Sequence, residues 1–354
     1  MGNNNQYVFF ELIRAGLWEK EARLSSYGVI GFPSILVMAE EQGVIGLVAA
    51  GLEHVVDIKL PKKDVIQFIG RVTQLEQRNT AMNYFIGVIV DKMHDAGINT
   101  LLVKGQGVAQ CYERPMWRPS GDVDFLLDKE NYQKAKDFLL PLSSGSKHEE
   151  RYSQHFGISI DPWYVEIHGT LRTGLSGRVD KMVDAVQNEV FLKKRVRTWK
   201  NGETQVFLPA PNHDVFLVFT HFIKHFYKEG VCLRQVCDWV RLLWSYRSVI
   251  DVSGLELWIK RAGLMNEWKA FASLAVEYLG MPVESMPLYS DNRKWIVKAN
   301  RIKMFIFNSG GRHKVYYTFA IAKIFPWSTL RFSPSIFLNV NWLKIKERIL
   351  VTNG

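Results

Sequence analysis

Cysteine is scarce in this sequence. Cys111, Cys232 and Cys237 are its only cysteines, none of them forms a C-x-x-C pair, and an odd number cannot pair completely within one chain. These features argue against a disulfide scaffold and against cysteine chemistry as the centre of function. They are typical of reduced thiols in a cytoplasmic protein.

Long apolar runs are also lacking. The best candidate, residues 316–327, is broken by Lys323 and Pro326, whereas a helix that spans a bilayer needs about 20 apolar residues. The first six residues lack the charged and apolar segments of a secretion signal, and Gln6 stands where an N-myristoylation motif needs Ser or Thr. We therefore expect a soluble, cytoplasmic protein without a transmembrane segment.

Acidic residues are nearly absent from the C-terminal region. Residues 292–354 contain twelve Lys or Arg and one acid, Glu347, so they account for the net charge of +10. Aromatic residues alternate with these basic residues. Two interpretations stay open: this region binds a polyanion or an anionic membrane surface, or it is a helical subdomain with a solvated basic face. The aromatic residues are Trp295, Phe305, Phe307, Tyr316, Tyr317, Phe319, Phe325, Trp327, Phe332, Phe337 and Trp342.

The spacing of apolar residues divides the chain into three regions. Residues 1–95 and 209–354 show helical periodicity, whereas residues 96–208 mix short strands with helices. This order predicts an α+β protein with a small mixed β-sheet core between N-terminal and C-terminal helical regions. The helices expected with most regular spacing are 7–18, 66–93, 132–140, 213–226, 233–244, 255–263 and 268–279.

Two aspartates begin a buried strand in the central region. Asp122 and Asp124 lie two residues apart and therefore project from one face, while Val123, Phe125 and Leu127 project from the other. Two neighbouring carboxylates repel each other unless a positive charge separates them, and a divalent cation is the usual partner. A pair of solvated surface aspartates is the alternative interpretation.

A third carboxylate follows the same pattern on a later strand, residues 163–168. Glu166 is flanked by Val165 and Ile167, and His168 shares its face. If the two strands are neighbours, three carboxylates converge on one site, where two Mg²⁺ ions could promote an in-line displacement and Glu166 could act as the general base. A purely structural Glu166 fits the sequence equally well.

A glycine-containing turn precedes the aspartates. Lys104-Gly105-Gln106-Gly107 follows the strand predicted for residues 99–105 and opens a short helix, so it could present backbone N–H groups and a lysine charge to phosphate. Arg114 and Arg118 could reach phosphate oxygens from the loop that returns to the aspartates. Gly105 and Gly107 do not form a dinucleotide-binding fingerprint, because its third glycine is missing.

Histidines supply weaker candidates. His221 and His225 are four residues apart on a predicted helix and could share a metal, but packing or substrate contact explains them as well. His155 and His168 flank the third strand and could contact phosphate or metal, or be satisfied buried histidines. The pattern assigns Asp238 no firm role.

Three of these motifs together resemble the bacterial branch of uncharacterised nucleotidyltransferases in the DNA polymerase β-like superfamily. They are Lys104-Gly105, Arg118-Pro-Ser-Gly-Asp122-Val-Asp124, and Glu166-Ile-His168, and the resemblance covers roughly residues 99–172. It implies that Asp122 and Asp124 bind metal and that Glu166 is the third carboxylate. In the wider superfamily a Ser or Gly stands in place of Gln106, which weakens the expectation that this turn recognises triphosphate.

This resemblance implies a metal-dependent transfer of a nucleoside monophosphate from an NTP to an unidentified acceptor. Two Mg²⁺ ions are expected as cofactors, with Mn²⁺ as a substitute. The residues expected to bind substrate are Lys104, Gly105, Gln106, Arg118 and His168. Two alternatives stay open: a catalytically degenerate protein of the same fold that binds nucleotides or polyanions, and a polymerase that extends RNA ends.

Overall fold

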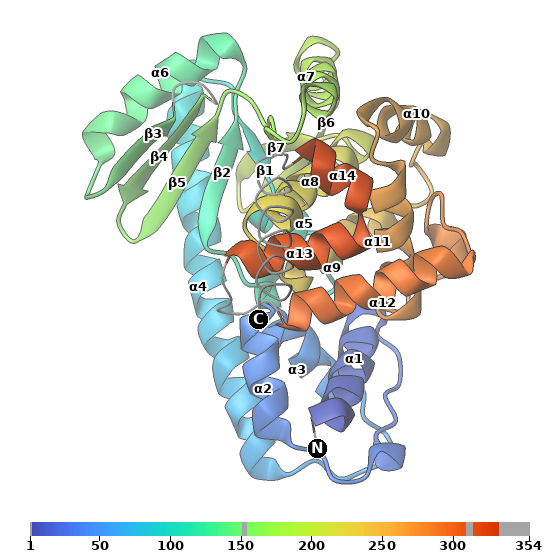
Figure 1. Ribbon diagram of the computed structural model, residues 1–354. Helices are drawn as coiled ribbons and strands as arrows, with labels where there is room; N and C mark the ends of the chain where they lie inside the picture. Colours follow the sequence, from blue (N-terminus) through green and yellow to red (C-terminus); the bar gives the residue numbers. More distant parts are fainter. Residues whose placement is uncertain (1, 151–153, 309–313, 333–354) are drawn as a thin grey trace, which may run out of the picture.

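The computed structural model describes residues 2–150, 154–308 and 314–332. A small sheet lies on one side of the molecule, and helices from both ends of the sequence lie together on the other (Figure 1). The two sets of helices share one apolar core, in which the ring centroids of Phe9 and Phe307 are 5.5 Å apart. The prediction of an α+β protein with flanking helices is confirmed.

The N-terminal helices lead into the sheet through one long helix, α4, which runs from the base of the molecule to the sheet (Figure 1). At 34 residues it is about 50 Å long. The helices before the sheet are α1 (Gly2–Trp18), α2 (Phe32–Glu41), α3 (Ile45–Glu53) and α4 (Lys62–Asp95), with a 3₁₀ turn η1 (Ser25–Tyr27).

The five-stranded sheet has the order β1-β2-β5-β4-β3. Strands β2 and β5 are parallel, and every other neighbouring pair is antiparallel. The two acidic strands are therefore neighbours, which is the condition for the three carboxylates to converge. The strands are β1 (Leu101–Val103), β2 (Asp122–Leu126), β3 (Lys147–Glu150), β4 (His155–Ile160) and β5 (Trp163–His168). Between them lie α5 (Gly105–Ala109), η2 (Pro115–Trp117), α6 (Lys129–Leu139) and η3 (Leu140–Leu142).

The two faces of this sheet differ in chemistry, as the alternation along the strands predicts. Val123 and Phe125 of β2 and Val165 and Ile167 of β5 are buried in a second apolar core, formed with α6 and the end of α4. The alternate residues, including the three acidic ones, face the opposite side. Burial of the apolar face therefore fixes the register that orients the acidic face.

A hairpin that the sequence analysis did not predict joins the core. Strands β6 (Val196–Asn201) and β7 (Thr204–Pro209) pair antiparallel, and β7 packs against β1. The dipeptide Asn201-Gly202 is a typical hairpin turn signal, and Gly202 has the positive φ of +62° that such turns require. Helix α7 (Gly177–Leu192) precedes the hairpin and was also not predicted.

The C-terminal half of the molecule is helical, as predicted. Helices α8 and α9 lie beside the sheet, and the later helices pack around them (Figure 1). The elements are α8 (Pro211–Lys228), α9 (Leu233–Ser245), α10 (Val252–Ala262), α11 (Met265–Glu277), η5 (Val283–Ser285), α12 (Arg293–Asn308), α13 (Lys314–Ile324) and α14 (Pro326–Phe332).

Aromatic residues of the basic C-terminal region serve mainly as core. Trp295, Phe305, Phe325 and Phe332 are buried, and the ammonium group of Lys298 lies 4.4 Å from the ring centroid of Phe325. Trp327 is the exception, with 81% of its surface exposed, so the described part of this region offers one strongly exposed ring rather than a stacking surface. Phe337 and Trp342, and the side chains of Tyr316 and Tyr317, lie outside the described residues.

Across residues 2–150, 154–308 and 314–332, we find no helix whose length and apolar content would suit a bilayer crossing. The cysteines Cys111, Cys232 and Cys237 are all free.

Candidate active site

The sheet brings the three acidic residues together. Asp124 of β2 and Glu166 of β5 are direct partners across the parallel pair, and Asp122 lies two residues earlier on β2. Carboxylate oxygens of all three lie within 4.8 Å of one another. Asp124 is buried, with 3% of its surface exposed, whereas Asp122 is more open to solvent.

Lys104 and two histidines contact this acidic cluster. The Lys104 Nζ and the His168 Nε2 both lie 2.8 Å from the Oδ1 of Asp124. The Nε2 atoms of His155 and His168 lie 3.2 Å and 3.5 Å from the Oε2 of Glu166. The two imidazole rings stack almost parallel, with centroids 4.8 Å apart. Their position on adjacent strands β4 and β5 holds them against the carboxylates.

These contacts shift the ionisation of the carboxylates in different directions. Burial would raise the pKa of Asp124, but Lys104 and the hydrogen bond from His168 outweigh it and lower that pKa. Burial would likewise raise the pKa of Glu166, but its contacts with His155 and His168 outweigh burial and lower that pKa. Repulsion from Asp124, together with burial, raises the pKa of Asp122. Asp122 therefore gains most from an added positive charge.

The donor set fits a hard divalent cation. Asp122, Asp124 and Glu166 offer three carboxylate oxygens, the type of ligand that Mg²⁺ prefers. Together with the charge of Lys104 they leave two negative charges, which one divalent cation neutralises. Both hydrogen bonds to Asp124 end on Oδ1, which leaves its Oδ2 to face a cation.

A second set of ligand atoms overlaps the first. His155, Glu166 and His168 also place one ligand atom each within 4.8 Å of the others. Imidazole nitrogens favour transition metals over Mg²⁺, but both rings here already contact the Oε2 of Glu166. Glu166 belongs to both sets, so the histidines act first as partners of this carboxylate.

The turn before α5 has an unusual backbone conformation. Lys104 has φ = +58° and ψ = −149°, a strained combination for a residue with a side chain, and such strain is concentrated at functional sites. Gly105 follows with φ = +39°, and a Cβ there would lie 3.2 Å from the Ser120 Oγ. This conformation ends β1 abruptly and directs Lys104 toward Asp124.

Helices α8 and α9 form a second wall opposite the carboxylates. A cleft of about 440 Å³ separates the two walls, which is within the usual size range for a small-molecule site. All three carboxylates, with Lys104, Gly105, Arg118 and His168, line this cleft. On the helical wall the lining includes His221, Lys224, His225, Arg234 and Asp238.

A buried ion pair connects the two walls. The guanidinium group of Arg118, which precedes β2, donates from Nε and Nη2 to the two carboxylate oxygens of Asp238 on α9, each at 2.7 Å. The Tyr112 hydroxyl donates to the same carboxylate at 2.8 Å. Arg118 is therefore engaged with Asp238, and its geometry points to positioning of the loop rather than to direct contact with phosphate.

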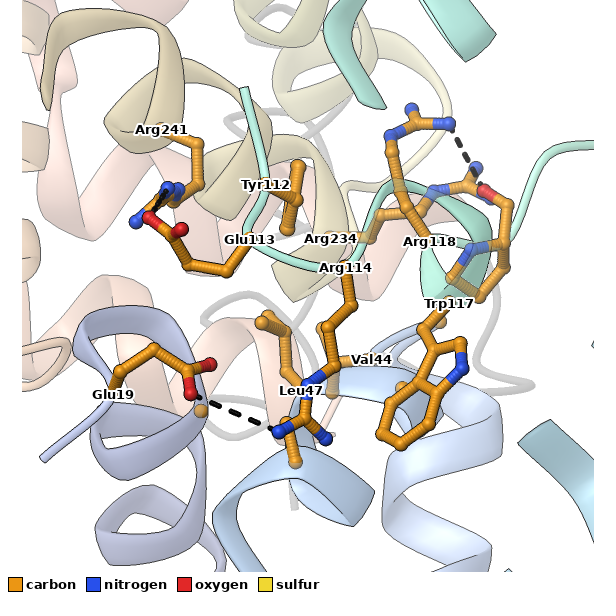
Figure 2. A pocket seen from close by; sticks show the side chains of 15 residues that line it. Glu19, Val44, Leu47, Tyr112, Glu113, Arg114, Trp117, Arg118, Arg234 and Arg241 are labelled. Atoms are coloured by element: carbon orange, nitrogen blue, oxygen red, sulfur yellow. Dashed lines mark hydrogen bonds and ion pairs between the residues drawn. The ribbon is translucent and has the colours of Figure 1, made fainter. Parts of the chain in front are cut away.

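A second, smaller pocket lies between α3 and the loop before β2 (Figure 2), and it shares Arg118 and Arg234 with the cleft. The Nη2 of Arg114 forms an ion pair with the Oε2 of Glu53 at 2.7 Å and lies 3.8 Å from the Oε2 of Glu19. The Nη2 of Arg241 forms an ion pair with the Oε1 of Glu113 at 2.9 Å. The enclosed space is about 20 Å³, room for one water molecule. The expectation that Arg114 reaches substrate phosphate is not met, because the carboxylates of Glu53 and Glu19 hold its guanidinium group in this pocket.

Gln106 also lies apart from the cleft. Its side chain is 1% exposed and donates to the Oδ1 of Asn79 on α4 at 2.8 Å. The expected contact between this side chain and substrate finds no support, because the amide anchors α5 to α4 instead.

The sequence pattern did not indicate the helical wall as a set. It indicated His221 and His225 as a weak metal pair or as packing or substrate contacts, and it did not indicate Lys224 or Arg234. The available signal was a series of polar residues on two otherwise strongly apolar helices, since buried polar side chains need partners or a function.

Comparisons with known proteins agree with the geometry. A family model described as an uncharacterised nucleotidyltransferase matches residues 30–280. No curated protein matches the chain. Among solved structures, an antigenic nucleotidyltransferase-like protein from Paracoccidioides brasiliensis is similar, with 11% identity and a TM-score of 0.34. That match covers 57% of this chain and 93% of the other, and at so low a TM-score it carries no argument.

Proposed function

The chain belongs to the family of uncharacterised nucleotidyltransferases, and on this premise we propose that it transfers a nucleoside monophosphate from an NTP to an acceptor, with release of pyrophosphate. The observation that carries the proposal is the convergence of three carboxylates within 4.8 Å, on one wall of a cleft large enough for a nucleotide.

Asp122, Asp124 and Glu166 would hold Mg²⁺, with Mn²⁺ as a substitute. The bound ion would neutralise charge on the phosphates and stabilise the attacking and leaving oxygens. Because the apo cluster with Lys104 carries only two negative charges, a second ion would need the additional charge of the triphosphate. His155 and His168 hold Glu166 ionised and in place.

The helical wall supplies basic side chains for the phosphates. Lys224 and Arg234 line the cleft, and neither forms an ion pair with any residue that the structure describes. The Arg234 side chain donates to the carbonyl of Pro119 from Nη1 at 3.0 Å, which fixes its direction and leaves its charge uncompensated. We assign the β- and γ-phosphates to these two residues, together with the Lys104-Gly105 turn.

A screen with labelled NTPs and cell extract tests this function. The wild-type protein should transfer label from the α-phosphate in the presence of Mg²⁺, and the Asp122→Asn, Asp124→Asn double variant should not. The matched control is Asp95→Asn, Asp137→Asn, which removes two exposed aspartates outside the cleft. Wild-type protein that binds polynucleotide without metal, and neither binds nor consumes NTP, would favour the degenerate binding protein instead.

A further inference from the structure

A histidine pair on α8 faces the carboxylates from the opposite wall. The His225 Nδ1 lies 2.7 Å from the Oε2 of Glu229, and its Nε2 lies 2.9 Å from the Nε2 of His221. All three residues line the same cleft as Asp122, Asp124 and Glu166. The pair therefore borders the space in which an acceptor would meet the nucleotide.

The contacts of His225 determine which of its nitrogens carries a proton. An ionised carboxylate only accepts hydrogen bonds, so the His225 Nδ1 must donate to Glu229. The Nε2 of neutral His225 is then an acceptor, and His221 donates to it from its own Nε2. The result is a directed chain from His221 through His225 to Glu229, whose remaining lone pair is on the Nδ1 of His221, a residue that lines the cleft.

Both histidines are held neutral. Burial lowers the pKa of His225, Lys224 and Lys104 add to this effect, and Glu229 opposes it. Burial also lowers the pKa of His221, with further contributions from Lys104, His225, Lys224 and His168. A neutral imidazole oriented by a carboxylate is the usual arrangement of a histidine that accepts a proton from a hydroxyl group.

The sheet wall offers no equally free base. Asp124 already accepts hydrogen bonds from Lys104 and His168, and Glu166 is contacted by two histidines. A carboxylate oxygen that binds a cation is no longer free to take a proton. The base role that the sequence assigned to Glu166 is therefore better filled from the other wall.

We propose that the histidine pair His221 and His225, oriented by Glu229, is the general base of the proposed transfer, and that the acceptor is an alcohol hydroxyl presented along α8. This inference rests on the proposed function. The hydroxyl proton passes to the His221 Nδ1, and the Nε2 proton of His221 passes to the His225 Nε2. The hydroxyl oxygen bonds to the α-phosphorus, and the bond from that phosphorus to the bridging oxygen breaks. Pyrophosphate leaves with the electron pair, and Glu229 stabilises the imidazolium until water removes the proton. A phosphate or carboxylate acceptor would need no such base, because its attacking oxygen is already ionised.

The kinetic test compares pyrophosphate release from labelled NTP, with Mg²⁺ and cell extract, in wild type, His225→Asn and Glu229→Gln. His225→Asn should lower kcat about 10²- to 10⁴-fold, the usual contribution of general acid–base catalysis, while the thermal shift with Mg²⁺ and NTP stays unchanged. Glu229→Gln should lower kcat about 10- to 100-fold, as expected for the loss of an orienting carboxylate. His94→Asn, an exposed histidine on α4, is the matched control and should keep wild-type rates.

The pH profile separates a base from a structural residue. The wild-type rate should fall at a pH below 6.5, because the pKa of His225 is lowered from its ordinary value, and Glu229→Gln should move this limb to still lower pH because Glu229 supports the charged form. His225→Asn should lose the limb. A His225→Asn protein with wild-type kcat and an unchanged profile would overturn the proposal and leave the nucleotidyltransferase assignment standing.

Imidazole ¹⁵N spectra test the same idea without activity. His225 should carry its proton on Nδ1, and Glu229→Gln should shift the proton distribution. A wild-type His225 protonated on Nε2 would contradict the proposal, even if His225→Asn were too unstable to assay. Wild-type protein that neither binds NTP with Mg²⁺ nor releases pyrophosphate would instead remove the proposed function, and the base role with it.

Discussion

The two walls of the cleft are built in different ways. The sheet wall takes its acidic residues from adjacent strands β2 and β5, where the register alone places Asp124 beside Glu166. The helical wall takes Lys224, His225 and Arg234 from α8 and α9, which are seated on the core shared by both helical regions. The sheet wall concentrates negative charge, and the helical wall combines basic side chains with neutral histidines.

This difference indicates a division of work. The sheet wall is suited to hold a cation rigidly, because Asp124 and Glu166 are register partners on neighbouring strands and are contacted by Lys104 and two histidines. The helical wall is suited to hold phosphate and to accept a proton. The following predictions alter one wall, or the link between the walls, at a time.

Removing the charge of the sheet wall should have the largest effect. Asp122→Asn with Asp124→Asn should lower the transfer rate by at least about 10³-fold, or roughly 4 kcal/mol, because the cation loses two ligands. Without metal, Asp122→Asn alone should melt at a higher temperature, because its repulsion by Asp124 disappears. Activity assays and thermal melts with and without EDTA check both parts, and equal activity in variant and wild type would refute the site.

Breaking the ion pair of Arg118 with Asp238, which links the two walls, should mainly lower the free energy of unfolding. Arg118→Met leaves the buried carboxylate of Asp238 unpaired, so the free energy of unfolding should fall by about 3–5 kcal/mol. Arg118→Met with Asp238→Leu should recover most of this loss, because no charge then remains buried. Urea denaturation measures both. Equal losses in the single and double variants would show that the contact does not depend on charge pairing.

Neutralising the helical wall should weaken nucleotide binding and leave the cation in place. Lys224→Gln or Arg234→Gln should each raise KM for the NTP about 10-fold, or more than 1 kcal/mol, with little change in kcat. Arg247→Gln, an exposed arginine stacked on Trp244, is the control. Unchanged KM in both variants would assign the phosphates to Lys104 and Gly105 on the other wall.

A smaller effect, on the melting temperature, is expected at Glu267 beneath the helical wall. Glu267 on α11 is fully buried and accepts a hydrogen bond from the Tyr227 hydroxyl at 2.8 Å, and burial raises its pKa above the ordinary 4.5. Protonated Glu267 therefore contributes its full stabilisation of the fold below pH 4.5. This contribution is lost as the pH rises through the pKa that Glu267 has in the folded protein. Glu267→Gln should raise Tm at pH 7 by about 2–4 °C, the shift that roughly 1 kcal/mol gives in domains of 150–250 residues. The difference should shrink toward pH 4.5, and activity should not change.

Much of the sheet wall could be predicted from the sequence. A period of two places Asp122 and Asp124 on one face and Val123 and Phe125 on the other, and the structure confirms this alternation. The pattern also indicated Glu166 as a candidate third carboxylate. Such inferences succeed because side-chain direction within a strand depends only on local backbone geometry.

Other parts could not be predicted in this way. Asp238 had no assigned role in the sequence, yet it is the partner of Arg118, 120 residues away. Gln106 looked like part of a phosphate turn, but its side chain is buried against Asn79. Each assignment depends on which distant side chain lies opposite, and that depends on how helices pack.

The sequence by itself therefore determined an α+β chain with a pair of aspartates on the polar face of a buried strand, because local periodicity and burial act over a few residues. Only the tertiary structure decided that Glu166 completes the cluster, that Arg118 pairs with Asp238, and that His225 faces the carboxylates across the cleft. These arrangements join segments far apart in the chain: the pairing of β2 with β5 brings the carboxylates together, and the packing of α8 and α9 on the shared core forms the opposite wall of the cleft.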